Sequence, residues 1–433
     1  MAKLPETHTL GSIDLTHFAI ELRASEPALM DSLNGGSDNR PAQVFSHELT
    51  HWGDIVGTVW GQNYIDQLFL ALDTAVPDDP DEYRHHQMIS FFDLKRRMIF
   101  PEYYKWLSPN ARSASTNEPW RIEVSCGGFF DFNGHPNPSD PIFFVVFRDH
   151  HSGEKLIRQP ITISSILEMR AVASEIVTFM EHAVSLPDEE RIVSEILFQN
   201  RIGAELYHHE LTTYTAAAHY LASVTKIDNA PEVYMLGYRL AEIILNIQPE
   251  HLTDFVHPVH HQPFAEEKLN GFIAKGDLGY LFCALGLSYG QSQGESIDER
   301  IEAALALLGM PTQKQIIQDF KSFWGSPSTI LKSVNLKELI ELRLTLAMSG
   351  AGIAHIRAAT NGAPVSASQC IAKDAHFPVI MTGDVEVIKF NEFGMSEIDQ
   401  AILHKLADRL DFHTKNSLRA ARGYDFNWGD YTY

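Results

Sequence analysis

The chain has 433 residues, of which 44% are hydrophobic and 21% charged, a composition typical of a globular protein with roughly two or three domains. Its 56 acidic and 34 basic residues give a net charge of −22, which argues against nucleic acid or an anionic membrane as a partner, because phosphate groups bind to basic surfaces. The cysteines, Cys126, Cys283 and Cys370, form no C-x-x-C pair, which predicts a reducing compartment and no disulfide framework.

The sequence also allows predictions about targeting signals and membrane spans. The first residues, 1–7, contain no apolar core of a signal peptide, so we expect no secretory leader. A run of 18 apolar residues does not occur anywhere in the sequence, so we expect no transmembrane span. Together with the cysteine pattern, these features predict a cytoplasmic protein.

In chain order, the first elements are a strand, a loop and a long helix. Residues 13–23 alternate well enough to predict a strand, and the glycine- and asparagine-rich residues 34–39 predict a loop. Pro41 is a favoured first-turn residue, and a helix is predicted from it to about residue 75. This helix carries an apolar stripe and a polar stripe on different faces. The apolar stripe is Phe45, Leu49, Trp52, Val56, Val59 and Trp60, and the polar stripe is His47, His51, Asp54, Thr58 and Gln62.

The polar stripe contains the sequence His47-Glu48-Leu49-Thr50-His51, which is the H-E-x-x-H pattern of zinc hydrolases. Residues four positions apart lie about 40° apart around a helix, so both imidazoles can reach one Zn²⁺. Glu48 lies beside them, where it can handle a proton but is poorly placed to be a third ligand. A solvated helix face would carry the same kind of polar stripe, so this simpler interpretation is weighed beside the metal site.

Three glycines interrupt the same predicted helix. Gly53, Gly57 and Gly61 should each cost about 0.5–1 kcal/mol relative to alanine. Two interpretations are open at this point. The glycines admit the close approach of another backbone or a substrate over the metal face, or they serve close helix packing or a helix end near Gly53.

Beyond this helix, the sequence predicts a small β region and then a long helical region. A second helix is predicted over about 81–106, and strands follow it. An edge strand of this β region could pair with an extended substrate. The predicted strands are 119–132, 140–149 and 154–160. The predicted helices of the second half are 164–184, 188–200, 202–225, 231–247, 264–274, 277–288, 296–309, 312–323, 334–359 and 395–409, with a β-prone stretch at 378–390.

The order of these elements predicts an α+β fold that is predominantly α, with a small antiparallel β region beside the motif helix. We expect residues 1–186 to form a metal-binding domain and residues 187–433 to form a mainly helical substrate or regulatory domain.

A third ligand has to come from elsewhere, because catalytic zinc usually has three protein ligands, often two His and one Glu. Glu168 is the first candidate, and Glu175 recurs on the same helix face, where it could orient one imidazole. Ser165 and Glu168 also fit a capping box, which explains Glu168 without a metal. Glu210 and Glu205 are the alternative ligands.

With the motif and Glu168 together, the chain resembles the zincin metallopeptidases, and more narrowly the gluzincins, in which H-E-x-x-H is followed by a downstream Glu. The run Phe45-x-His47-Glu48-x-x-His51…Gly57-Thr58-x-x-Gly61 is also similar to bacterial proteins with a small-residue helix after the motif. In those proteins a Leu-Glu-x-x-Ala-like segment supplies the third ligand, and Leu167-Glu168-Met169-Arg170-Ala171 is similar. The interval from His51 to Glu168 is longer than in familiar gluzincins, and the resemblance does not extend to residues 230–433.

The resemblance implies a zinc-dependent metallopeptidase with a peptide or protein substrate. It implies Zn²⁺ held by His47, His51 and Glu168, with Glu48 as general base. A Tyr or His would stabilise the oxyanion, and the candidates are Tyr207, His209 and Tyr214. Two further hypotheses are open: a helical interaction protein whose motif is vestigial or coincidental, and a zinc hydrolase acting on a non-peptide amide.

Overall fold

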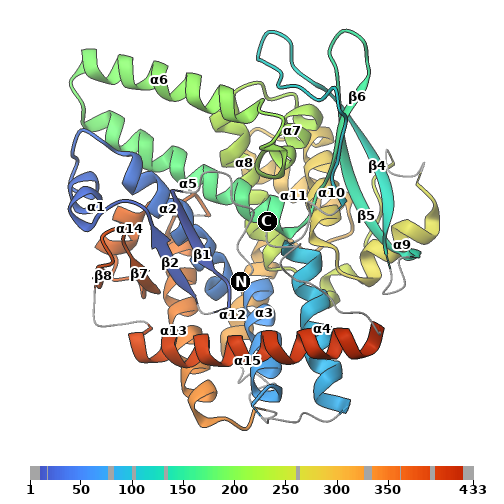
Figure 1. Ribbon diagram of the computed structural model, residues 1–433. Coiled ribbons are helices and arrows are strands. Elements are labelled where there is room, and N and C mark those ends of the chain that lie inside the picture. The colour runs from blue at the N-terminus through green and yellow to red at the C-terminus, as the bar shows by residue number, and fades with distance from the viewer. Residues whose placement is uncertain are drawn as a thin grey trace.

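Helices dominate the computed structural model, and two four-stranded sheets accompany them (Figure 1). The expected α+β, predominantly α fold class is therefore confirmed. Some positions of the predicted elements lie outside the described part of the chain, namely 17, 81, 100–103 and 131–132. The structure describes residues 10–16, 18–76, 82–99, 104–130, 135–259, 264–325, 334–360, 362–390 and 395–422.

The first sheet joins the two ends of the chain. Strands β1 (Gly11–Asp14) and β2 (Ala19–Leu22) form an antiparallel hairpin, and β2 pairs in parallel with β7 (Val379–Met381), which pairs with β8 (Val387–Ile388). The single strand predicted over 13–23 is wrong, because the chain reverses between Asp14 and Ala19 and so forms a hairpin. Among the described strands of this sheet, β1 lies at an edge.

The helix predicted over 41–75 is also two elements, α2 (Arg40–Gly57) and α3 (Val59–Thr74). Thr58 between them is extended, with φ −129° and ψ 159°. Its hydroxyl accepts a hydrogen bond from the Gly61 N–H at 3.0 Å and donates one to the Asp54 carbonyl at 2.6 Å. Thr58 therefore ends α2 and caps α3.

The glycines of α2 serve close helix packing against α13 (Lys337–Ala359). A Cβ at Gly53 would lie 2.9 Å from Arg357 Nη2, and a Cβ at Gly57 would lie 2.9 Å from Ile353 Cγ2. The glycine side of α2 is thus filled by another helix, which agrees with the packing interpretation and not with a substrate lying over it.

The second sheet is antiparallel, with the strand order β3-β6-β5-β4. Its strands are β3 (Trp106–Leu107), β4 (Arg121–Phe130), β5 (Pro136–Arg148) and β6 (Lys155–Pro160). The remaining elements are α1 (Glu26–Leu33), α4 (Glu82–Ile99), α5 (Ile163–Ser185), α6 (Asp188–Leu206), α7 (Thr212–Thr225), α8 (Ala230–Leu245), the 3₁₀ helix η2 (Pro249–Leu252), α9 (Glu266–Ala274), α10 (Leu278–Gln291), α11 (Ile297–Leu307), α12 (Gln313–Gly325), α14 (Ala367–Ala372) and α15 (Glu397–Arg422). The predicted helix over 202–225 is wrong, because α6 extends to Leu206 and a turn separates it from α7.

The buried apolar side chains form two large clusters. One is built from residues between Trp120 and Ile316, and it includes the inner side chains of the second sheet and of α5, α7, α8 and α10. The other combines residues 13–98 with residues 334–410, so the last helices pack with the first ones. The domain division between residues 186 and 187 stays a prediction.

Among the described helices, α13 alone is long and apolar enough to cross a membrane by length and composition. Its Arg343 and Arg357 are buried and pair with Asp66 of α3 at 2.7 Å and with Asp54 of α2 at 2.5 Å. The core helix of a folded domain passes the same test of length and composition, so α13 is weak evidence for a membrane span. The expected absence of such a span stays a prediction.

A histidine that is buried beside the first cluster should make the stability of the protein depend on pH. The ring of His219 on α7 packs against Trp120 and Phe147, and its Nε2 lies 2.8 Å from the Leu206 carbonyl oxygen. Burial lowers the pKa of His219 to about 4, whereas the pKa in the unfolded chain is near 6.5. The unfolded state therefore binds more protons between these values, so the stability present above pH 6.5 is lost as the pH falls toward 4.

Between pH 7.5 and pH 5, we expect the unfolding free energy of the wild type to fall by about 2 kcal/mol more than that of His219→Gln. Urea unfolding at several pH values measures this difference. His355→Gln, at an exposed position of α13, is the matched control and should show no such shift. A difference for His219→Gln that is constant with pH would contradict the assignment.

Candidate metal centre

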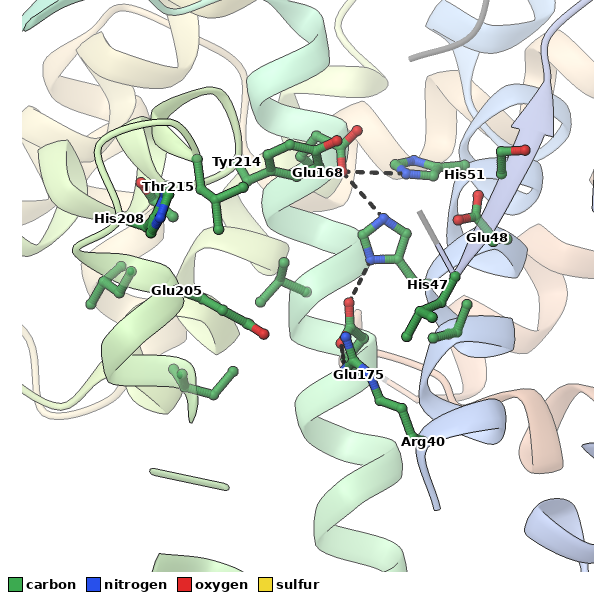
Figure 2. A pocket seen from close by; sticks show the side chains of 18 of the residues that line it. Arg40, His47, Glu48, His51, Glu168, Glu175, Glu205, His208, Tyr214 and Thr215 are labelled. Atoms are coloured by element: carbon green, nitrogen blue, oxygen red, sulfur yellow. Dashed lines mark hydrogen bonds and ion pairs between the residues drawn. The ribbon is translucent and has the colours of Figure 1, made fainter. Parts of the chain in front are cut away.

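The motif residues lie where α2 packs along α5. His47, Glu48 and His51 line one side of a cavity, and Glu168 and Glu175 line the adjoining side from α5 (Figure 2). His51, Glu48 and Glu168 are 1%, 6% and 2% exposed. The solvated-face interpretation of the polar stripe therefore does not describe this part of α2.

Glu168 approaches both imidazoles of the motif. Its Oε2 lies 3.2 Å from His47 Nε2 and 3.6 Å from His51 Nε2, and the two ring centroids are 4.9 Å apart. One ligand atom from each of the three residues lies within 4.8 Å of the others. Two imidazoles and one carboxylate at this spacing could hold a metal ion, and they are a frequent donor set for zinc.

The buried polar atoms of these residues also fit a cation. Within the described residues, no hydrogen-bond partner is present for Glu168 Oε2 or for either ring nitrogen of His51. Such atoms cost free energy when they stay unpaired in the interior. A metal ion among them would satisfy His51 Nε2 and Glu168 Oε2, and His51 Nδ1 would carry the proton of the neutral imidazole. The residues present therefore fit the group that the sequence motif implies.

The capping-box explanation of Glu168 finds no support in the geometry. The residue that caps α5 is Thr162, and no side-chain hydrogen bond caps this helix. The Ser165 hydroxyl donates instead to the Pro160 carbonyl at 3.4 Å. Glu168 is therefore aimed at the imidazoles of α2 and not at the start of its own helix.

Glu175 holds the far side of the His47 ring. Its Oε1 lies 2.7 Å from His47 Nδ1, and its Oε2 accepts a hydrogen bond from Arg40 at 2.8 Å. An Nδ1–H donated to Glu175 leaves the lone pair of Nε2 directed toward Glu168 and the cavity. This is the geometry expected for a carboxylate that orients a metal-binding imidazole.

Charge favours a cation at this position. Burial acts to raise the pKa of Glu168, but the His51 and His47 charges outweigh burial and bring the pKa to about 2. Burial acts to lower the pKa of His47, and the carboxylates of Glu168 and Glu175 raise it well above its usual value. The raised pKa of His47 reports the negative charge of the carboxylates around it, and a divalent cation would offset the same charge.

The cavity that contains these residues has a volume of about 910 Å³. The alternative ligands Glu205 and Glu210 line the same cavity but are not part of the described His-and-carboxylate cluster that could hold a metal. Of the oxyanion candidates, Tyr214 lines the cavity, whereas Tyr207 and His209 are not part of its lining.

The strand that reaches the cavity is β1, through residues 10–13. The expected edge strand from the second sheet is therefore a wrong prediction: none of the described residues of β3–β6 belongs to the lining. The β1–β2 hairpin places β1 against α2, where a Cβ at Gly11 would lie 2.7 Å from Val44 Cγ1 and 3.1 Å from Glu48 Cγ. The order of elements along the chain does not reveal this contact.

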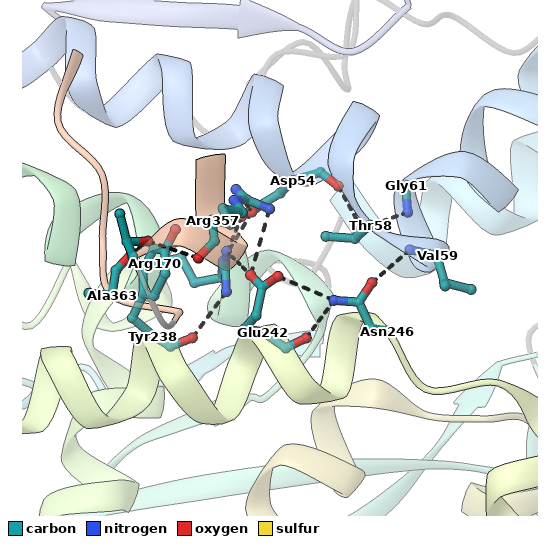
Figure 3. Close-up of polar contacts among 11 residues, drawn as sticks. Asp54, Thr58, Val59, Gly61, Arg170, Tyr238, Glu242, Asn246, Arg357 and Ala363 are labelled. Carbon is teal, nitrogen blue, oxygen red and sulfur yellow. Dashed lines mark hydrogen bonds and ion pairs between the residues drawn. The ribbon is translucent and has the colours of Figure 1, made fainter. Parts of the chain in front are cut away.

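Directly beyond the metal face, three buried charges and one partly buried charge join four helices (Figure 3). We call Asp54 of α2, Arg170 of α5, Glu242 of α8 and Arg357 of α13 the charge quartet. Arg170 Nε donates to both carboxylate oxygens of Asp54 at 3.0 and 3.1 Å, and its Nη2 donates to Glu242 at 2.6 Å. Arg357 Nη2 donates to Asp54 at 2.5 Å.

The charge quartet holds the two helices that carry the candidate ligands. Asp54 follows His51 by one turn of α2, and Arg170 follows Glu168 by two residues of α5. Two carboxylates and two guanidinium groups balance each other, which lowers the cost of burying them. Helical spacing places Asp54 on the polar stripe, but nothing local to Glu242 or Arg357 in the sequence indicates a contact among these charges.

Comparisons of the chain with protein-family models, with curated proteins and with solved structures gave no significant match. The resemblance to zincins therefore depends on the motif and on the convergence of His47, His51 and Glu168.

Proposed function

We propose that this protein is a zinc-dependent metallopeptidase of the H-E-x-x-H type. The observation that carries the proposal is the meeting of His47, His51 and Glu168 in the wall of a cavity. His51 Nε2 and Glu168 Oε2 are buried there without a hydrogen-bond partner among the described residues. A helical interaction protein with a coincidental motif would leave this convergence unexplained. The three cysteines are free, which supports the further proposal of a cytoplasmic location.

Each residue of the site has a part in this proposal. His47, His51 and Glu168 would hold the zinc, which would polarise the scissile carbonyl and lower the pKa of a water toward about 7. Glu48 is the carboxylate left over for proton transfer, first from the water and then to the leaving amine. Burial raises the pKa of Glu48, which makes its carboxylate a stronger base. Tyr214 is the candidate donor to the oxyanion.

A peptide substrate is supported by the strand beside the site. Residues 10–13 line the cavity, and β1 is the edge of its sheet. An edge strand offers unpaired backbone N–H and C=O groups to an extended chain. Small non-peptide amides have no use for such an edge, so we favour a peptide or protein substrate over them.

Zinc content tests the metal site and its third ligand together. We expect about one zinc per chain in the wild type, because a single three-ligand set is proposed, and loss of zinc in His47→Ala and Glu168→Ala. Glu210→Ala is the matched control and should keep its zinc. Elemental analysis of the purified proteins, with circular dichroism to check folding, gives the answer. If Glu210→Ala loses its zinc and Glu168→Ala keeps it, Glu210 and not Glu168 is the third ligand. If the wild type contains no zinc, the hypothesis of a helical interaction protein with a coincidental motif is favoured.

A further inference from the structure

The carboxylates that line the cavity fall into two groups. Glu168 faces the imidazoles, Glu175 pairs with His47 and Arg40, and Glu48 is proposed to transfer protons. The other two carboxylates, Glu205 and Glu210, line the cavity from the last turn of α6 and from the segment before α7. This α6–α7 wall lies across the cavity from α2 and β1 (Figure 2).

Glu205 is half-buried, and its carboxylate has no partner among the residues that the structure describes. Its side chain points from α6 into the cavity (Figure 2), and none of the described residues forms a hydrogen bond or ion pair with its carboxylate. The two nearby arginines are engaged elsewhere. Arg40 donates to Glu175 at 2.8 Å, and Arg201 donates to Gln43 at 2.6 Å.

The electrostatic setting of Glu205 favours a cation from outside the chain. Burial raises the pKa of this carboxyl, and the charge of Glu175 raises it further, while Arg201 and Arg40 offset only part of this. A positively charged group that enters the cavity would therefore stabilise the Glu205 carboxylate. Arg23, the remaining arginine of the lining, directly follows β2 and is exposed, so it belongs to the strand side and not to the α6–α7 wall.

We propose that Glu205, together with Glu210 of the same cavity lining, binds a cationic group of the substrate. An ammonium or guanidinium group is the matching chemistry, so the enzyme would prefer peptides with a basic side chain or a free amino terminus close to the cleaved bond. This inference rests on the proposed peptidase function, and it adds the charge of the substrate. The net charge of −22 would also speed the approach of a cationic peptide.

The experiment compares quenched fluorogenic peptides that differ only in charge. One series places arginine or norleucine at successive positions around the cleaved bond, and each peptide is made with a free and with an acetylated amino terminus. The zinc-loaded enzymes are wild type, Glu205→Gln and Glu210→Gln. Glu189→Gln, an exposed position at the start of α6 outside the cavity, is the matched control.

We expect wild type and Glu189→Gln to prefer the cationic peptide by about ten-fold or more in kcat/KM, which corresponds to about 1.4 kcal/mol. In Glu205→Gln the ratio of the two kcat/KM values should fall toward one, with a smaller fall in Glu210→Gln. If acetylation of the amino terminus abolishes the preference, the bound cationic group is the terminal ammonium group. If the preference for arginine survives acetylation, the bound group is the arginine side chain. Glu205→Gln should unfold no more easily than wild type, because it removes an unpaired, half-buried charge.

The inference and the proposed function can fail separately. Peptide cleavage with equal rates for arginine and norleucine, or a preference that Glu205→Gln leaves intact, overturns the inference and keeps the peptidase. If the wild type cleaves no peptide, the peptidase proposal fails, and calorimetric titration of the same peptides into wild type and Glu205→Gln decides the inference. About ten-fold tighter binding of the arginine peptide that is lost in Glu205→Gln supports it, and equal binding overturns it.

Discussion

Glu48→Gln is expected to lower kcat for peptide hydrolysis by about 10²–10⁴-fold while zinc stays bound. Glutamine has nearly the same shape as glutamate but does not accept a proton at neutral pH. Glu48 is 6% exposed and lines the cavity, and its carboxylate forms no hydrogen bond or ion pair with a described residue. Its replacement should therefore remove the proton transfer and leave the packing of α2 unchanged.

Steady-state kinetics on a quenched peptide, with zinc content and thermal unfolding measured beside them, separate these effects. Loss of kcat with unchanged zinc content and melting temperature identifies a role in the reaction and not in the fold. Glu189→Gln is again the control, since it removes a carboxylate far from the cavity lining. A Glu48→Gln enzyme that cleaves as fast as wild type would exclude the proposed mechanism.

Arg170→Met is expected to destabilise the protein by about 3–5 kcal/mol, because it leaves the buried carboxylate of Asp54 and the partly buried carboxylate of Glu242 with one guanidinium group. Arg170 is fully buried, contacts Asp54 and Glu242, and donates to the Tyr238 carbonyl at 3.0 Å. Methionine fills much of the same volume, so the loss would report mainly the charge and its hydrogen bonds.

Urea unfolding of Arg170→Met, Glu242→Gln and the double variant tests this account. The double variant removes one charge of each sign, so its loss of stability should be smaller than the sum of the single losses. Lys337→Met breaks an exposed i,i+4 pair with Glu341 on α13 and should cost less than about 1 kcal/mol. A loss for Arg170→Met as small as for Lys337→Met would show that the charge quartet does not hold these helices together.

The local part of the site follows from the sequence. His47 and His51 share a helix face because of the helical repeat alone, so their pairing needs no knowledge of the fold. Glu168 and Glu175 recur on one face of α5 for the same reason. The structure brings both faces together, and the binding of zinc to them stays a prediction until metal content is measured.

Helix ends and strand pairings are harder to predict from the sequence. Thr58 breaks the predicted helix of residues 41–75, and the Val59 N–H donates a hydrogen bond to the side chain of Asn246, the residue that follows α8, at 3.1 Å. The β1–β2 hairpin depends on β7, which comes from the other end of the chain. Both features are stabilised by partners distant in sequence, and helix or strand periodicity contains no information about such partners.

By itself, the sequence determined which residues share a helix face, and hence a pair of imidazoles with a carboxylate beside them. Only the tertiary structure decided that α5 lies against this face, that α13 fills the glycine side of α2, and that β1 reaches the cavity. Asp54 shows the reason, since its two arginine partners lie 116 and 303 positions away along the chain. Contacts over such separations form only when buried charges and apolar surfaces of several helices fit together at once.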